Sequence, residues 1–237
     1  LCFFFKQKTA YEITCRDWGS DVCSSDLLNC KGNHIRKKTF NLKSVALKFF
    51  IVEDYIIGLK KLSTKLGIDG FIEFGPSLLI PEERIRKYCY ENICGNYGKH
   101  YMCPPLIGTV EEIKSKLNLY NKAILVRYSE EVDVKNDRKK VKRSKIDFHK
   151  IILEIENFLS QGGIESWGLV GGSCSFCIEC KAITNRPCKH PHKARPSLES
   201  LGIDVQKLLD NFGLDNKFYP DKIVWTGCIL LKENTTR

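Results

Sequence analysis

Four cysteines stand close together in the segment GGSCSFCIECKAITNRPCKHPHKARPS, residues 171–197. They are Cys174, Cys177, Cys180 and Cys188, with the spacing C-x2-C-x2-C-x7-C. Three thiolates at successive intervals of three are hard to direct at one tetrahedral zinc, which usually takes a C-x2-C pair from each of two segments. The spacing suits the separate irons of a [4Fe-4S] cluster, which in bacterial ferredoxins binds C-x2-C-x2-C and a further cysteine beside a proline. We therefore predict an iron–sulfur cluster here, with zinc as the alternative.

A second cysteine group lies upstream, around the sequence CGNYGK. Its members, Cys89, Cys94 and Cys103, are spaced C-x4-C-x8-C. Three thiolates leave one coordination position of a metal for another ligand, and His100, Cys228, a water or a substrate are the options. An open position of this kind would allow the metal to act as a Lewis acid. The alternative is a zinc or cluster site that only staples the loop.

Basic and imidazole side chains surround the last cysteine of the downstream group. Because four cysteines already complete a cluster, we expect the histidines there to donate to the sulfurs or bind an anion rather than ligate metal. The lysines and the arginine would offset the negative charge of a cluster or dock an acidic redox partner. The side chains expected to support the cofactor in this way are Lys189, His190, His192 and Arg195.

Composition places the chain in a broad class. The longest apolar stretch, residues 45–52, is too short to span a membrane and carries Lys48, and no signal peptide is visible. We therefore expect a cytoplasmic protein, in which reducing conditions favour metal or redox chemistry over disulfides for the nine of its twelve cysteines that follow residue 27. The net charge of +10 permits nucleic acid, acidic proteins or anionic substrates as partners without selecting among them, and the oligomeric state is not indicated.

The first residues of the chain do not resemble a natural protein sequence. Residues 3–27 resemble the translation of a sequencing-library adapter, so we exclude residues 1–27 from fold reasoning and expect them to be disordered. Residues 28–237 are then expected to form a single metal-binding domain with cysteine loops at 89–105 and 171–197.

Hydrophobic periodicity predicts helices that alternate with strands. The expected helices cover 52–67, 82–92, 109–120, 144–163 and short pieces of 198–209. The expected strands lie in 70–80, 122–129, 166–172 and 222–231. This alternation favours an α/β or α+β layered sandwich, a mixed sheet with helices, whose cysteines sit on connecting loops.

Local signals refine this picture. Thr109 and Glu112 form a capping-box pattern, and Ser144 is the expected N-cap of the long helix. The basic segment 135–145 is expected to be a solvated loop or strand tip, with a nucleic-acid contact as the alternative. His149 is expected to be a partly exposed helix residue rather than a ligand. Cys228 reads most simply as a buried core thiol.

With both cysteine groups in view, residues 85–231 resemble an uncharacterised family of predicted metal-binding proteins, the domain-of-unknown-function family 2284, common in anaerobic bacteria and archaea. The resemblance rests on C-x4-C-GNYGK-x3-CPP at 89–105, GGSC-x2-C-x2-C at 171–180 and PCKHPHKARPSLESLGIDV at 187–205. The family more often has arginine where Lys189 stands. The resemblance implies metal binding by the seven cysteines and does not supply a reaction.

Three functions follow as hypotheses. The first is a cytoplasmic iron–sulfur protein of electron transfer or anaerobic redox metabolism, with a four-cysteine [4Fe-4S] site and a second metal site or cluster at the three-cysteine group. The second is a zinc-stapled binding module whose basic segment contacts nucleic acid. The third, a thiol redox enzyme, is disfavoured because the C-x2-C pairs do not open a helix in a βαβ unit.

Overall fold

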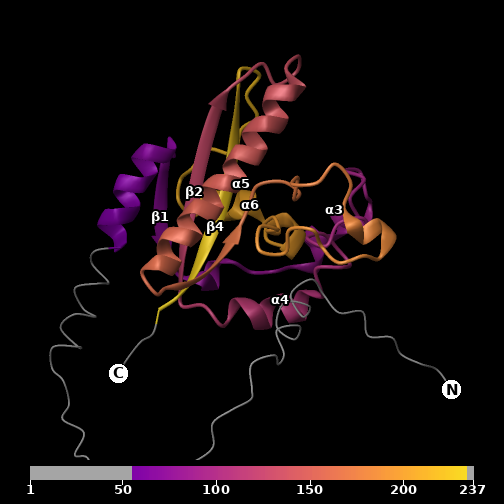
Figure 1. Cartoon of the computed structure of the whole chain (residues 1–237), viewed down its shortest axis with the longest axis horizontal. Coiled ribbons are helices and arrows are strands. Elements are labelled where there is room, and N and C mark those ends of the chain that lie inside the picture. The colour runs from indigo at the N-terminus through magenta and orange to yellow at the C-terminus, as the bar shows by residue number, and fades with distance from the viewer. Residues whose placement is uncertain (1–54, 234–237) are drawn as a thin grey trace, which may run out of the picture.

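A four-stranded antiparallel sheet forms the centre of the computed structural model, which describes residues 55–233 (Figure 1). Its strands, in the spatial order β1-β2-β4-β3, are β1 (Gly70–Phe74), β2 (Lys122–Glu131), β3 (Glu165–Leu169) and β4 (Lys222–Lys232). β2 pairs along its whole length with β4, from Lys122 opposite Leu231 to Glu131 opposite Lys222. The adapter-like residues 1–27 lie outside the described residues, and the division into one domain stays a prediction.

The α+β form of the fold prediction is confirmed, but the sheet is not mixed. β2 and β3 run in the same direction, as expected for strands joined by a helix, yet β4 lies between them and pairs antiparallel with both. The parallel contact found among the described residues is an isolated bridge between Val170 and Ser197. The last strand therefore converts a parallel arrangement into an antiparallel sheet, which the local pattern of each strand does not reveal.

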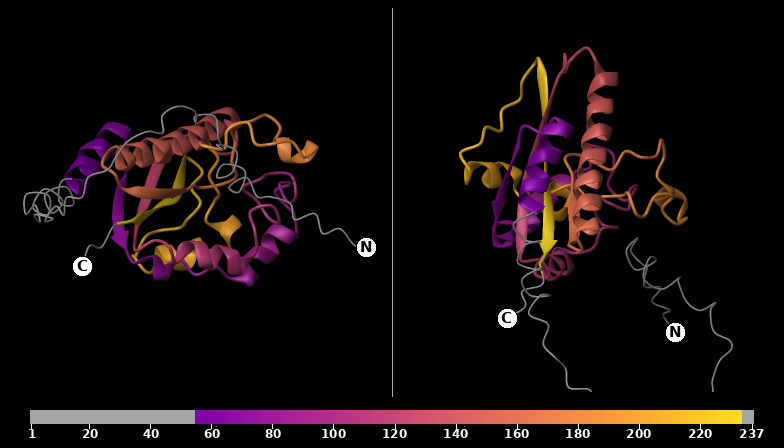
Figure 2. Two further views of the ribbon diagram at one scale, coloured as in Figure 1. Left: turned by 60° about the horizontal axis from the view of Figure 1, so that its bottom comes forward. Right: turned by 60° about the vertical axis from the view of Figure 1, so that its left-hand side comes forward.

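Helices cover both faces of this sheet, as Figure 2 shows. The long helix α5 (Arg138–Gln161) lies on one face, together with the helix that the described chain forms over residues 55–66. α4 (Val110–Leu117) and α6 (Val205–Asp210) lie on the other. α3 (Glu83–Tyr90) and the short 3₁₀ turns complete the regular structure: η1 (Pro76–Leu78), η2 (Lys181–Thr184) and η3 (Glu199–Leu201). None of the helices in this part of the chain has the length and apolar character needed to cross a membrane.

The central strands are apolar on both faces because each face has its own core. On β2, Ile124 and Val126 pack with α5, whereas Ala123 and Leu125 pack with α4 and α6. Side chains of a strand alternate between faces, so a continuous apolar run is what a strand between two helical layers requires. Cys228 of β4 lies fully buried in the second of these cores, which confirms its prediction as a core thiol.

The long helix α5 begins earlier than its sequence suggested. Its N-cap is Asp137, whose carboxylate accepts the backbone N–H of Lys140 at 2.9 Å, and not Ser144. Ser144 is buried within the helix and accepts the indole N–H of Trp225 at 3.0 Å. The predicted basic loop is therefore mostly the first turns of a helix, because lysine and arginine are good helix formers once a cap is supplied.

The start of α4 is as predicted. The amide of Glu112 donates to Thr109 Oγ1 at 3.2 Å, and the Thr109 amide donates to Glu112 Oε2 at 2.9 Å. This capping box starts the helix directly after the upstream cysteine loop, with Val110, Ile113 and Leu117 buried in the core. It fixes the point at which that loop must rejoin the folded body.

The contact between β4 and α5 gives a stability prediction. A Cβ at Gly227 would lie 2.4 Å from the carbonyl oxygen of Leu169 and 3.0 Å from Cζ of Phe148. We expect Gly227→Ala to lower the free energy of unfolding by about 1–3 kcal/mol, the usual cost of overpacking, measured by urea denaturation. Gly70→Ala is the matched control, because no neighbouring atom lies within 4 Å of its added Cβ. Equal unfolding midpoints for the two variants would contradict this packing.

Candidate metal centre

Both cysteine groups lie in one lobe beside the sheet, on the side away from β1 (Figures 1 and 2). The upstream group begins in the last turn of α3 and ends just before α4. The downstream group follows β3, from which the chain leaves the sheet at Gly171 and Gly172. A Cβ at Gly171 would come within 3.0 Å of the Thr226 carbonyl oxygen, so a residue without a side chain is needed for this exit.

The upstream loop is closed by its own backbone. The Gly98 amide donates to the Pro104 carbonyl at 2.8 Å, and the Tyr97 amide donates to the Asn92 side chain at 3.0 Å. Gly98 has a φ of 68°, a conformation that favours glycine. As a result Cys103 is turned inward and is only 7% exposed, while Cys94 is exposed.

Backbone amides donate to two sulfurs of the downstream loop. The His190 amide lies 3.4 Å from Sγ of Cys188, and the Phe176 amide donates to Cys174. Burial raises the pKa of both thiols, and these N–H groups act in the opposite direction by stabilising the thiolate. The amides therefore offset part of the cost that burial places on the thiolate, which is the form that binds metals.

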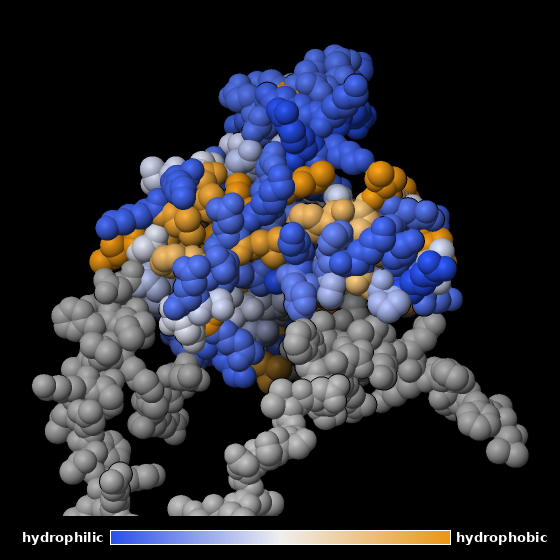
Figure 3. Space-filling view, viewed as in Figure 1, coloured by the Kyte–Doolittle hydropathy of each residue, from blue (hydrophilic) through white to orange (hydrophobic). Residues whose placement is uncertain are grey.

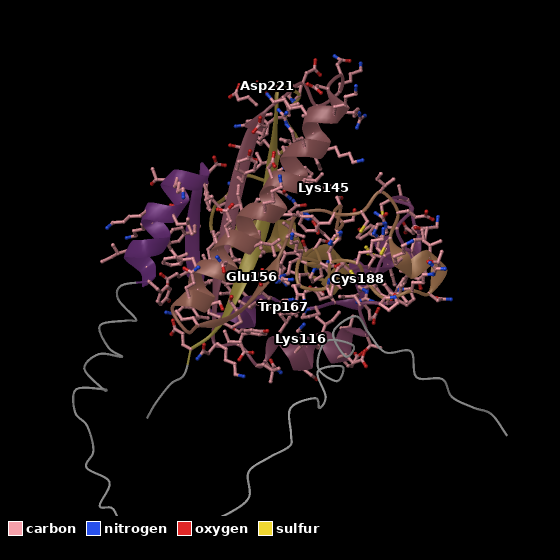
Figure 4. The ribbon with its side chains drawn as sticks, viewed as in Figure 1. Lys116, Lys145, Glu156, Trp167, Cys188 and Asp221 are labelled. Carbon is pink, nitrogen blue, oxygen red and sulfur yellow. The ribbon has the colours of Figure 1, made fainter. Side chains whose placement is uncertain are left out.

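The two groups meet at Cys103. Burial, and after it the nearby thiolates of Cys94, Cys89, Cys174 and Cys180, raise the pKa of this thiol to about 12, so members of both groups act on it. Figure 4 shows the sulfur atoms gathered around the labelled Cys188. The seven predicted ligands thus come from two loops far apart in sequence and lie in one region.

Tyr101 ties the two loops together. Its hydroxyl donates to the carbonyl of Arg186 in the downstream loop at 2.7 Å. Burial raises the pKa of Tyr101, and so do the charges of Cys180 and Cys188. The upstream loop is therefore held against the downstream one by a side chain two residues before Cys103.

A buried arginine lies behind the upstream group. Arg86 is 2% exposed, and its Nη2 donates to the Gly108 carbonyl at 2.9 Å. Its Nε and Nη1 are buried without a hydrogen-bond partner in the described structure. Its charge opposes the effect of burial on the pKa of Cys89, one helical turn further along α3. A buried cation with open donors beside thiols fits a centre that carries negative charge.

α5 presents a polar stripe to the downstream loop through Lys145, His149 and Glu156. His149 is 1% exposed, so the expectation that it is partly exposed was wrong. Its Nε2 lies 3.2 Å from the Gly171 carbonyl, its ring packs edge-on against Phe176, and burial lowers its pKa to about 4. The reason is tertiary: the loop after β3 folds back over this face of the helix.

Lys145 faces the cysteines from the same stripe. Burial lowers the pKa of Lys145, and the thiolates of Cys174 and Cys103 act in the opposite direction. Lys145 and Arg86 were not singled out by the sequence. Their positions in the sequence could have indicated them, because residues three or four apart lie on the same face of a helix. Lys145 stands four residues before His149, and Arg86 stands three residues before Cys89.

The thiols do not yet form a closed ligand set. The eight cysteines of the described residues are all free, and among residues 55–233 no group of three or more His, Cys, Asp or Glu side chains is already placed to hold one metal ion. Cys228 does not belong to this group of cysteines. Burial raises its pKa, and no other cysteine contributes to that shift. His100 lies near Lys145, which adds to the effect of burial in lowering its pKa.

The expected supporting residues have different surroundings. Lys189 and His192 are exposed, and His190 is half-buried. Arg195 turns inward, where its Nε lies 2.8 and 3.0 Å from the two carboxylate oxygens of Glu156. Whether any of these side chains binds a cofactor stays a prediction. The donor set itself, free thiols with amide donors and buried cations around them, fits a thiolate-bound metal centre.

The difference in enclosure between two upstream thiols gives a prediction for the metal-free protein. We expect iodoacetamide at pH 8 to modify Cys94 at least tenfold faster than Cys103, measured by mass spectrometry of the peptides. A thiol with a pKa of about 12 has a thiolate fraction on the order of 10⁻⁴ at this pH, and the thiolate is the nucleophile. Equal rates would show that Cys103 is not enclosed.

Comparison with known proteins agrees with the donor set. The model of a family described as predicted metal-binding protein (DUF2284) matches residues 73–231, a range that includes all seven cysteines of the two loops. No curated protein and no solved structure matches the chain. Because the match covers well over half of the sequence, the chain belongs to this family of predicted metal-binding proteins.

Proposed function

We propose that the protein is a cytoplasmic iron–sulfur protein that acts in electron transfer or anaerobic redox metabolism. The observation that carries the proposal is the meeting of thiols from the two loops at Cys103, where Cys89 and Cys94 come from one loop and Cys174 and Cys180 from the other. The cations of Arg86 and Lys145 lie next to them. A single zinc ion needs four ligands, and this region offers more thiols than one such site takes. Two sites account for the number of thiols, and the spacing C-x2-C-x2-C favours a cluster at one of them.

The downstream group is the proposed [4Fe-4S] ligand set, with Cys174, Cys177, Cys180 and Cys188 each binding one iron corner. The upstream group is the proposed second metal site. Its fourth position is left to His100, a water or a substrate, because Cys228 belongs to the core.

The other residues of the lobe would influence the reduction potential of such a centre. When bound, a cluster supplies one-electron transfer at a potential set by charge, hydrogen bonds to sulfur and solvent exposure. The amides of Phe176 and His190 donate to sulfur, and Arg86 and Lys145 place positive charge beside the thiolates. All four groups stabilise the more negative, reduced state.

Metal analysis tests the proposal directly. Protein expressed and purified without oxygen is expected to be brown and to hold iron with matching acid-labile sulfide, about four to eight of each per chain. Cys180→Ala is expected to lose at least one cluster's share of iron. Cys228→Ala, which removes a core thiol, is the matched control and should keep the full content. A colourless anaerobic preparation without sulfide would overturn the iron–sulfur assignment.

The surface of the lobe favours an acidic redox partner. Ile93 and Ile178, each beside a cysteine, are 85% and 106% exposed, and Lys189 and Lys193 of the downstream loop are also exposed. Figure 3 shows hydrophobic side chains among hydrophilic ones on the lobe. Apolar residues with a basic rim suit short-lived docking of an acidic electron carrier.

We expect electron exchange with an acidic carrier protein such as a ferredoxin to slow at least fivefold between 50 and 300 mM salt, measured by stopped flow, because salt screens the steering charges. The variant Lys189→Glu should slow exchange at low salt, and Lys60→Glu, on the exposed face of the helix at 55–66, should not. A rate independent of salt would contradict a basic docking surface.

A second function, the zinc-stapled module that contacts nucleic acid, is favoured by one observation. At the hydrophilic tip of the molecule, near the labelled Asp221, Phe218 is 102% exposed and Lys222 lies 4.2 Å from the ring of Tyr219. The amide of Val134 donates to the Pro220 carbonyl, so this tip adjoins the basic start of α5. An exposed ring and a half-buried one beside lysines suit single-stranded nucleic acid. The metal analysis separates the two functions, because this one requires zinc without sulfide.

A further inference from the structure

Arg86 on α3 is a buried cation that has no counter-ion among residues 55–233. It is 2% exposed, and its Nη2 donates to the Gly108 carbonyl at 2.9 Å. Its Nε and Nη1 are buried and have no hydrogen-bond partner in this part of the chain. Arginine stays charged throughout the pH range in which proteins are folded, and a buried charge is costly unless it is paired. Two N–H groups of Arg86 can therefore still donate to an anion.

The carboxylates nearest to Arg86 in the sequence are engaged elsewhere. Glu82 accepts from Nε and Nη2 of Arg84, at 2.7 and 3.1 Å. Glu83 accepts the hydroxyl of Tyr90 at 3.0 Å. The ion pair that α3 makes within the described residues thus belongs to the exposed Arg84 and not to the buried Arg86. The anion that would balance Arg86 has to come from another kind of group.

Cys89 is a group that the charge of Arg86 reaches. It stands three residues further along α3, so the two side chains lie on one face of the helix. Burial raises the pKa of the Cys89 thiol, and the charge of Arg86 opposes this effect. A cysteine that binds a metal does so as a thiolate. Metal binding at Cys89 would therefore place a permanent negative charge one helical turn from Arg86.

Arg86 is also held in place before any metal binds. Its hydrogen bond to Gly108 joins α3, where the upstream loop begins, to the residue before Thr109, the N-cap of α4. The stem of Arg86 packs against Gly202, where an added Cβ would lie 3.2 Å from Cγ of the arginine. A guanidinium fixed in this way loses little freedom when it gains a partner, which favours binding.

We propose that Arg86 is a positioning residue of the upstream metal site, and that its open N–H groups donate to the Cys89 thiolate when a metal is bound. A divalent ion held by three thiolates carries net negative charge, which the buried guanidinium balances. The inference rests on the part of the proposed function that makes Cys89, Cys94 and Cys103 a metal site. It does not depend on whether the metal is iron or zinc.

Cobalt(II) titration of the full chain, stripped of metal and kept reduced without oxygen, tests the proposal. Brief alkylation with iodoacetamide, followed by mass spectrometry of the peptides, measures the protection of Cys94 separately from that of Cys177. Arg86→Met should raise the cobalt concentration that half-protects Cys94 at least tenfold and leave that for Cys177 within twofold. Lys87→Met removes a charge from the exposed side of the same helix, and this matched control should titrate as the wild type does.

Urea unfolding separates a positioning role of Arg86 from a structural one. Without metal, Arg86→Met should unfold at the same urea concentration as the wild type or at a higher one, because it removes a buried charge that has no counter-ion. Cobalt should raise the unfolding midpoint of the wild type more than that of this variant. Arg86→Lys keeps the charge and loses the fork of donors, so its half-protecting cobalt concentration should lie between the other two, at least threefold from each.

Three results would overturn the proposal. The first is protection of Cys94 in Arg86→Met at the wild-type cobalt concentration. The second is an equal loss of cobalt affinity at Cys177, which would indicate general damage to the fold. The third is an Arg86→Met variant that unfolds earlier than the wild type without metal and gains as much stability from cobalt.

The metal analysis described above can fail independently of this test. Zinc in place of iron and sulfide would overturn the iron–sulfur assignment, whereas the effect of Arg86→Met on cobalt binding would still support the positioning role. Conversely, a wild-type protein that contains iron and sulfide but whose Cys94 is never protected by cobalt would overturn the role of Arg86 and leave the downstream cluster in place.

Discussion

The ion pair between Glu156 and Arg195 connects the parts of the structure on which function depends. Glu156 stands on α5 and also accepts the amide of Gly168 in β3, and Arg195 ends the downstream cysteine loop. Their side chains are 10% and 18% exposed. Removing one member of such a pair generally costs about 3–5 kcal/mol, because the other charge stays buried without compensation. The loop, the helix and the sheet edge are therefore held in one geometry by a contact that tolerates little change.

This pair explains how a loop rich in cysteine and glycine can be positioned at all. The loop leaves the sheet at Gly171 and returns at the bridge between Val170 and Ser197, so its two ends meet beside one strand. Between them it contains one short 3₁₀ turn, η2. His149 and Lys145 support its first part from α5, and Arg195 anchors its last part. The cysteines lie between these two supports, and Tyr101 holds the carbonyl of Arg186 within this middle part.

Sequence reasoning succeeded where the determining contacts are local. The capping box of Thr109 and Glu112 spans four residues, and the apolar run of β2 needs only its own neighbours to be recognised. Sequence reasoning failed where a segment distant in the sequence determines the burial of a residue or the pairing of a strand. His149 is buried because a loop 22 residues away covers it, and the sheet is antiparallel because β4 inserts between β2 and β3. Cysteine spacing revealed each group, but their meeting at Cys103 depends on two loops separated by most of the fold.

The arrangement of charge gives the lobe its asymmetry. Arg86 and Lys145 approach the cysteines from the folded body, whereas Ile93 and Ile178 face outward beside them. Positive charge in a poorly solvated position acts strongly on nearby thiolates, and exposed charge is screened. The folded body therefore determines the electrostatic potential at the cysteines. The outer surface of the lobe determines how a partner can reach them.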